Sequence, residues 1–144
     1  MTTLTPYLCC REAARAIEFY TKAFGAKETM RLAEPSGKIA HAELEIGGAT
    51  IMLADEHPDF GVLSPTSVGG TPVKLHLYVD DADGVVARAV AAGAKIVRPL
   101  QDQFYGDRSG QIEDPFGHVW FVATKKEQLS VGEIQRRHDA MKRQ

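Results

Sequence analysis

Two stretches of this chain decide its fold: Gly48-Ala-Thr-Ile-Met-Leu-Ala54 and Gly117-His-Val-Trp-Phe-Val-Ala123. They align with each other at an offset of 69 residues (117 − 48). A second pair, Gly25-Ala-Lys27 and Gly93-Ala-Lys95, repeats at an offset of 68, and each copy follows a segment with helical apolar spacing. Because both pairs repeat at nearly the same offset, the sequence predicts two copies of one structural unit.

Each copy reads as a strand, a helix and three further strands. The first strands are expected at 4–10 and 73–80, and the helices carry apolar stripes that begin at Ala13 and Ala82. The remaining strands are expected at 27–34, 38–47 and 49–55, and at 95–102, 104–113 and 117–124. We therefore predict one α+β domain over 1–144, built from two βαβββ modules (4–55 and 73–124), a connector (56–72) and a helical tail (125–144).

The tail is expected to form one more helix, because Ser130 and Glu133 fit a capping box. Its narrow apolar stripe can pack against the body of the chain or against a partner subunit. The tail is also basic, and its charges suit either a solvated helix face or a functional patch.

Composition excludes several classes of protein. The chain has 144 residues and a formal charge of −2, which argues against nucleic acid as its main partner. No apolar run is long enough for a membrane helix, and the first residues lack the pattern of a signal peptide. The only cysteines, Cys9 and Cys10, are adjacent, so they form no disulfide framework and are expected to point to opposite faces of a strand. We expect a cytoplasmic protein without membrane contact.

Three motifs carry a family resemblance: Ala-Ile-Glu-Phe-Tyr-Thr-Lys-Ala-Phe-Gly at 16–25, Val-Asp-Asp at 79–81 and Asp-Pro-Phe-Gly-His-Val-Trp at 114–120. With them the chain resembles the vicinal-oxygen-chelate superfamily, which includes glyoxalase I, bleomycin-resistance proteins, fosfomycin-resistance enzymes and extradiol dioxygenases. Pro-Tyr-Leu at 6–8 and Gly-Asp-Arg at 106–108 resemble its PhnB-like branch. The resemblance implies that the modules curve into a cup-shaped open mixed β-barrel, the glyoxalase/bleomycin-resistance fold, and that the protein is a homodimer.

The resemblance also marks four positions, one on the first and one on the last strand of each module, that hold a metal in metal-using relatives. Here these positions are Thr5, Met52, Lys74 and Phe121. Methionine and phenylalanine supply no oxygen or imidazole donor, and a lysine ammonium repels a cation. If the register of the last strand of the first module is shifted so that Glu56 takes the place of Met52, only one of the four positions gains a metal ligand. We therefore predict neither a metal nor another cofactor.

Several polar residues should face the cup. His41 and Glu43 alternate with apolar residues, so they share a face and form either an acid/base pair or an ordinary polar pair. Lys74 and His76 likewise form either a functional pair in the cup or an ordinary polar pair exposed to solvent. The run 55–59, Asp-Glu-His-Pro-Asp, superficially resembles a metal cluster, but a solvated loop explains it without ligand spacing.

Aromatic residues suggest what the cup would bind. Tyr105 and Arg108 follow Phe104, and an aromatic pair beside a guanidinium suits a planar or anionic ligand, although packing at the module junction explains the same residues. Trp120 and Phe121 alternate, and the predicted register places Phe121 in the cup and Trp120 in the core. His118 is expected to make a local hydrogen bond.

Two functions follow. The first is a metal-independent protein that sequesters a small molecule in the cup. The second is a glyoxalase-type lyase or isomerase that acts on a thiol conjugate or hydroxy-carbonyl compound through a non-standard site. No catalytic residue is assigned. The candidate ligand-binding residues are Tyr7, His41, Glu43, Met52, Lys74, His76, Tyr78, Tyr105, Arg108 and Phe121.

Overall fold

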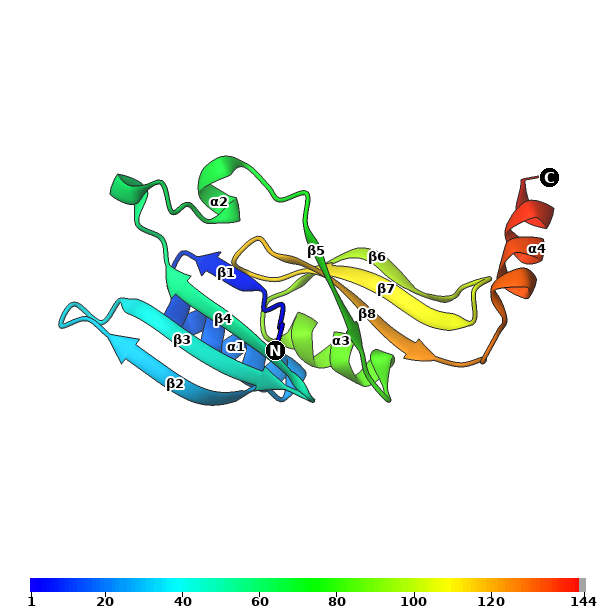
Figure 1. The fold of residues 1–144 in the computed structure, drawn as a ribbon, viewed down its shortest axis with the longest axis horizontal. Helices are drawn as coiled ribbons and strands as arrows, with labels where there is room; N and C mark the ends of the chain where they lie inside the picture. The colour runs from blue at the N-terminus through cyan, green and yellow to red at the C-terminus, as the bar shows by residue number, and fades with distance from the viewer. Residues whose placement is uncertain (143–144) are drawn as a thin grey trace.

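Residues 1–142 are described by a computed structural model, which shows an α+β fold of two open four-stranded sheets with helices (Figure 1). The two sheets are not closed into one barrel, since no strand of the first pairs with a strand of the second. The first sheet and its helix comprise β1 (Tyr7–Cys10), α1 (Ala13–Phe24), β2 (Lys27–Ala33), β3 (Ile39–Ile46) and β4 (Ala49–Asp55).

The second sheet repeats the first. Its elements are β5 (Lys74–Tyr78), α3 (Ala82–Ala91), β6 (Lys95–Asp102), β7 (Asp107–Glu113) and β8 (Val119–Lys125). The strand orders are β1-β4-β3-β2 and β5-β8-β7-β6, with the first-named pair parallel in each sheet. Tyr7 lies opposite Met52, and His76 lies opposite Phe121, so the 69-residue offset holds in the strand register. The predicted βαβββ repeat is confirmed.

Two strands begin three residues later than the sequence suggested. β1 begins at Tyr7 rather than at residue 4, and the side chain of Leu4 is exposed. Pro6 has no N–H to donate to a sheet, although its carbonyl accepts a hydrogen bond from the N–H of Met52 at 2.9 Å. β7 begins at Asp107 rather than at residue 104, because a turn closes first through the N–H of Gln103, which donates to the carbonyl of Asp107 at 2.7 Å.

The helices join the two modules. α1 and α3 pack against each other, and buried side chains from both modules form one core cluster. At the junction, the Asp114 carboxylate accepts hydrogen bonds from the Tyr20 hydroxyl at 2.5 Å and from the Trp120 indole N–H at 2.9 Å. Since the helices cover one face of each sheet, the other face of each sheet stays open (Figure 1).

The connector contains a short 3₁₀ helix, η1 (Pro58–Phe60), and a one-turn helix, α2 (Pro65–Val68). Glu56 holds it together, because its carboxylate accepts hydrogen bonds from the Ser64 N–H at 3.0 Å and from the Ser67 hydroxyl at 2.8 Å. These hydrogen bonds favour the charged form and lower the pKa of Glu56 to about 2.

The tail forms α4 (Val131–Met141), which Figure 1 shows projecting from the end of the molecule farthest from β2 and β3. The Ser130 hydroxyl accepts a hydrogen bond from the N–H of Glu133 at 3.1 Å, as the capping box predicts. The Glu133 carboxylate instead pairs with Arg136 and Arg137. Residues 143–144 of the predicted tail lie outside the described residues.

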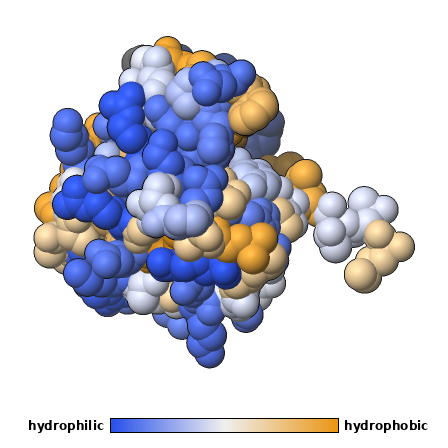
Figure 2. Space-filling view, turned by 90° about the vertical axis from the view of Figure 1, so that its left-hand side faces the viewer, coloured by the Kyte–Doolittle hydropathy of each residue, from blue (hydrophilic) through white to orange (hydrophobic). Residues whose placement is uncertain are grey.

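The surface at the β2 and β3 end is mostly hydrophilic, with hydrophobic residues in small groups (Figure 2). None of the helices described between residues 1 and 142 combines the length and apolar character that crossing a bilayer requires.

Candidate functional site

The open face of each sheet carries a row of side chains at equivalent positions. In the first sheet, Tyr7, Met52 and Glu43 lie side by side across β1, β4 and β3. In the second sheet, the register brings together His76 and Phe121 with Gln111 as their neighbour. Because successive side chains along a strand point to opposite faces, the intervening residues, such as Trp120, are buried under the helices. These two rows form the candidate site.

On the first sheet, three polar side chains form a continuous hydrogen-bonded chain. The Tyr7 hydroxyl lies 2.7 Å from Nδ1 of His41, and Nε2 of His41 lies 2.9 Å from a carboxylate oxygen of Glu43. A carboxylate only accepts, so Nε2 donates to Glu43 and Nδ1 accepts from the tyrosine. Burial, followed by the nearby Cys9 and Glu43, raises the pKa of Tyr7 and keeps its hydroxyl protonated.

On the second sheet, three aromatic rings form an array with a cation at each end. His76 stacks on Phe121 with ring centroids 5.4 Å apart and planes at 11°, and Tyr78 lies 4.6 Å from His76. The Lys74 ammonium lies 5.6 Å from the Phe121 ring, and the Lys125 ammonium lies 5.5 Å from the Tyr78 ring. Such an array offers π faces and positive charge to a planar ligand.

Polar groups hold the tyrosines of this sheet in place. The Tyr78 hydroxyl donates to the Asp107 carboxylate at 2.7 Å, and this hydrogen bond, followed by burial, raises the pKa of Tyr78. The Tyr105 hydroxyl lies 3.0 Å from the Ser109 hydroxyl. Beside Tyr105 and Phe121 there is a pocket of about 350 Å³, large enough for a small ring system.

Sequence reasoning predicted only Tyr105 and Phe121 of that pocket, and the residues that it missed include Arg98 and Gln111. Gln111 could have been found, because it alternates along β7 and lies opposite Phe121. Arg98 could not, because the pairing of β6 shifts register on both sides of it. A shift of register interrupts the alternation that sequence arguments use.

Arg108, one of the candidate ligand-binding residues, lies on the face of β7 opposite to the open face. Arg108 lies opposite Thr124, whose hydroxyl accepts a hydrogen bond from the N–H of Ala82 at the start of α3, so this face is covered by a helix. Its guanidinium makes a bidentate ion pair with Asp83, at 2.9 and 3.1 Å, and contacts Asp102 at 3.3 Å. The guanidinium that lines the pocket near Tyr105 is therefore that of Arg98 and not that of Arg108.

The four positions marked by the family resemblance do not suit a metal. Thr5 precedes β1, and Met52 lies beside Tyr7 without an oxygen or imidazole donor of its own. Lys74 is held over the Phe121 ring as a cation. Within residues 1–142, no three histidine, cysteine, aspartate or glutamate side chains gather in a way that could hold a metal ion. The residues present do not fit a metal at these positions.

The remaining candidates have structural roles. Asp55, from the run 55–59, accepts hydrogen bonds from the N–H groups of Ala13 and Ile39 at 2.9 and 2.6 Å, and so ties the start of α1 to β3. His118 contacts the carbonyl of Cys9 at 2.9 Å, which joins the modules rather than forming the expected local hydrogen bond. Cys10 is buried and Cys9 is half-buried, as alternation predicts.

Comparison with known proteins agrees with this fold. Residues 3–122 match the model of the Glyoxalase/Bleomycin resistance protein/Dioxygenase superfamily. The protein Mb0911c of Mycobacterium bovis is 47% identical over 135 residues, which cover 92% of this chain and 89% of that protein. The crystal structure of TioX from Micromonospora sp. ML1 is similar, with a TM-score of 0.68, 30% identity and coverage of 87% of this chain and 99% of TioX.

The structure of the Arabidopsis thaliana product At5g48480 is also similar, with a TM-score of 0.69, 28% identity and coverage of 85% of this chain and 98% of that one. The family match spans most of the chain and includes the strands of both open faces. The repeated sheets, their open faces and these similarities lead to one conclusion: the chain belongs to the Glyoxalase/Bleomycin resistance protein/Dioxygenase superfamily.

Proposed function

We propose that this chain binds a small planar molecule at the open faces of its sheets, without a metal. The observation that carries the proposal is the array of Lys74, Phe121, His76 and Tyr78 on the second sheet. Ligand sites are mostly apolar with a few polar anchors, and this array supplies stacking surfaces between two cations. The row of Tyr7, His41 and Glu43 supplies polar groups on the first sheet.

We further propose that a second copy of the chain completes the cup. The two open faces belong to separate sheets, and Tyr7 and Tyr78 are each about half exposed. In a homodimer, the first-sheet face of one chain would oppose the second-sheet face of its partner. Light scattering on the purified protein is expected to give twice the chain mass of 15.7 kDa, whereas a monomer mass would contradict this arrangement.

Replacing Phe121 with alanine is expected to weaken the binding of a planar ligand by about thirtyfold, the loss typical of a central aromatic contact. N-phenyl-1-naphthylamine is a suitable probe, because it is flat, uncharged and fluoresces in apolar surroundings. Its dissociation constant can be measured by fluorescence titration of both proteins.

Phe60→Ala is the matched control, because it removes the same ring from an exposed position on η1. The control should bind the probe like the unaltered chain. If Phe121→Ala binds it equally well, or if the unaltered chain does not bind it at all, the proposed site is wrong.

A second function is favoured by the hydrogen-bonded chain of Glu43, His41 and Tyr7. Glu43 orients the imidazole, and Nδ1 of His41 accepts from the hydroxyl of Tyr7, the one residue of the three that is exposed. A proton can therefore pass between a bound carbonyl compound and His41 through Tyr7. Acid–base chemistry of this kind suits the isomerisation of a hydroxy-carbonyl compound.

Under this second function, His41→Ala and Glu43→Gln should each slow proton exchange by about a hundredfold while the fold remains intact. The measurement is the exchange of the CH₂ protons of dihydroxyacetone with D₂O, followed by NMR. Glu45→Gln, on the same strand and the same face but outside the hydrogen-bonded chain, is the control. Unchanged exchange in both variants would exclude this role for the pair.

A further inference from the structure

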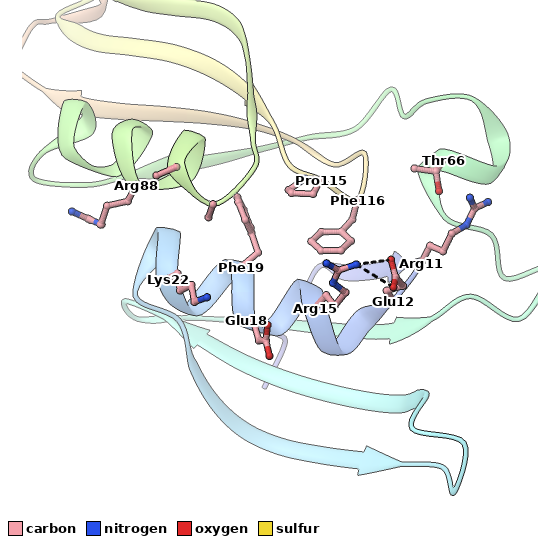
Figure 3. A pocket seen from close by; sticks show the side chains of 12 residues that line it. Arg11, Glu12, Arg15, Glu18, Phe19, Lys22, Thr66, Arg88, Pro115 and Phe116 are labelled. Carbon is pink, nitrogen blue, oxygen red and sulfur yellow. Dashed lines mark hydrogen bonds and ion pairs between the residues drawn. The ribbon is translucent and has the colours of Figure 1, made fainter.

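We propose that the chain has a second binding site, a groove on the helical side of the sheets that takes an organic anion with a flat apolar body. The groove encloses about 780 Å³ and is lined by residues of α1, α3, α2 and the turn between β7 and β8 (Figure 3). It is separate from the open faces, because its lining belongs to the helices and turns. Its volume lies within the range of small-molecule sites.

The floor of the groove is apolar. Phe19 and Phe116 are almost completely buried, with 4% and 7% of their surfaces exposed, and their rings meet edge to face at 6.4 Å. Pro115 and two alanines at the end of α3, Ala91 and Ala92, line the groove beside them. Because these side chains are held by the core, they offer a fixed surface on which a flat ring can lie.

The rim of the groove is positively charged. Four cations line it, against the two carboxylates Glu12 and Glu18; the cations are Arg11, Arg15, Lys22 and Arg88. An excess of cations is notable on a chain whose formal charge is −2. Figure 3 shows Lys22 and Arg88 at the α3 end of the groove, with the Arg88 guanidinium turned back along α3 towards Gly84, and Arg11 at the connector end. An anion in the groove is therefore flanked by positive charge.

The cations differ in how far they are neutralised. Arg11 donates to the Ser67 hydroxyl at 2.8 Å and lies 3.6 Å from Glu56, so the connector fixes its position. Arg15 has two long contacts of 3.4 Å, one with each carboxylate oxygen of Glu12. Across residues 1–142, neither Lys22 nor Arg88 has a carboxylate oxygen within 4.0 Å. These two free cations are the groups that an anionic ligand would satisfy, Lys22 directly and Arg88 by a change of side-chain rotamer.

The two features together define the ligand class. A hydrocarbon would use the floor but leave the cations without partners, and an inorganic anion would use the cations but leave most of the volume empty. An aromatic carboxylate, sulfonate or phosphate monoester uses both. The preferred ligand is therefore an aromatic ring system with one anionic group.

The test uses 1-anilinonaphthalene-8-sulfonate, which adds a sulfonate to nearly the same ring system as N-phenyl-1-naphthylamine. In the double variant Lys22→Gln/Arg88→Gln, the affinity for the sulfonate at the groove is expected to fall by about tenfold, the combined loss of two partly exposed ion pairs. The affinity for the uncharged naphthylamine should not change. Both are measured by fluorescence titration and calorimetry.

Lys27→Gln/Lys95→Gln is the control, because it removes two positive charges at the starts of β2 and β6, outside the groove. It should leave the affinity for the sulfonate within about twofold. In a Phe121→Ala background, the sulfonate should still bind the groove, so failure of the cup and failure of the groove give different results. The proposal is overturned if Phe121→Ala removes all sulfonate binding, or if both double variants weaken it equally.

Discussion

Replacing Asp114 with alanine is expected to lower the free energy of unfolding by about 4 kcal/mol, because four donors, two of them side chains buried in the core, lose their acceptor. Asp114 is 2% exposed. Its carboxylate accepts from the Tyr20 hydroxyl at 2.5 Å, from the Trp120 indole at 2.9 Å, and from the N–H groups of Phe116 and His118 at 2.9 and 3.0 Å. A loss of this size is a large part of the stability of a small domain.

The effect is expected to reach beyond the turn that holds Asp114. Tyr20 belongs to α1 in the first module, whereas Trp120 belongs to β8 in the second. The two rings also contact each other, with centroids 5.4 Å apart, and Phe24 lies 4.7 Å from Trp120. Without the carboxylate, the hydroxyl and indole N–H must stay unpaired in the core or draw water into the joint between the modules.

Urea denaturation followed by circular dichroism measures this loss. Asp102→Ala is the control, since the side chain of Asp102 is 78% exposed and, within residues 1–142, its one ion pair is with Arg108; its removal should cost less than about 1 kcal/mol. A similarly small loss for Asp114→Ala would show that the carboxylate is not what joins the modules.

Most of the fold could be predicted because its signals are local. The offset of 69 residues follows from two stretches of sequence, and the strand register reproduces it at Tyr7–Met52 and His76–Phe121. Alternation along β8 distinguished Trp120, in the core, from Phe121, on the open face. The same rule brought His41 and Glu43 to one face, where they form a hydrogen bond.

What the sequence did not reveal depends on distant partners or on irregular backbone. The partner of Arg108 is Asp83, 25 residues away on α3, and no local pattern connects them. Glu12 adopts φ of 65°, the one positive value at a residue other than glycine within 1–142, and its sequence gives no sign of it. That the sheets stay open agrees with the open barrel that the family resemblance implied; strand patterns alone describe faces and not how whole modules meet.

Gly117→Ala is expected to destabilise the chain by about 2–4 kcal/mol, because left-handed backbone strain and a steric clash act together. Gly117 has φ of +90°, and a Cβ placed there would lie 2.8 Å from Cβ of Pro65 in α2. Such a distance requires the connector or the turn to move. Denaturation in urea measures the loss.

The chain contains its own control for the strain. Gly37 closes the turn Glu34-Pro-Ser-Gly37 as Gly117 closes Asp114-Pro-Phe-Gly117, and its φ is +91°. In both turns the glycine N–H donates to the carbonyl of the first residue, at 2.9 and 3.1 Å. A Cβ at Gly37 would meet nothing within 4 Å. Gly37→Ala should therefore cost only the strain, about 1–2 kcal/mol.

The difference between the two substitutions isolates the packing of the connector on the second module. In a Pro65→Gly background the clashing Cβ is gone, so Gly117→Ala should cost no more than Gly37→Ala. If the two alanine substitutions cost the same in the unaltered chain, α2 does not press on the turn. A larger cost for Gly117→Ala than for Gly37→Ala would show that α2 packs on the turn. Because Thr66 of α2 lines the anion groove, this packing helps to fix the rim of the groove.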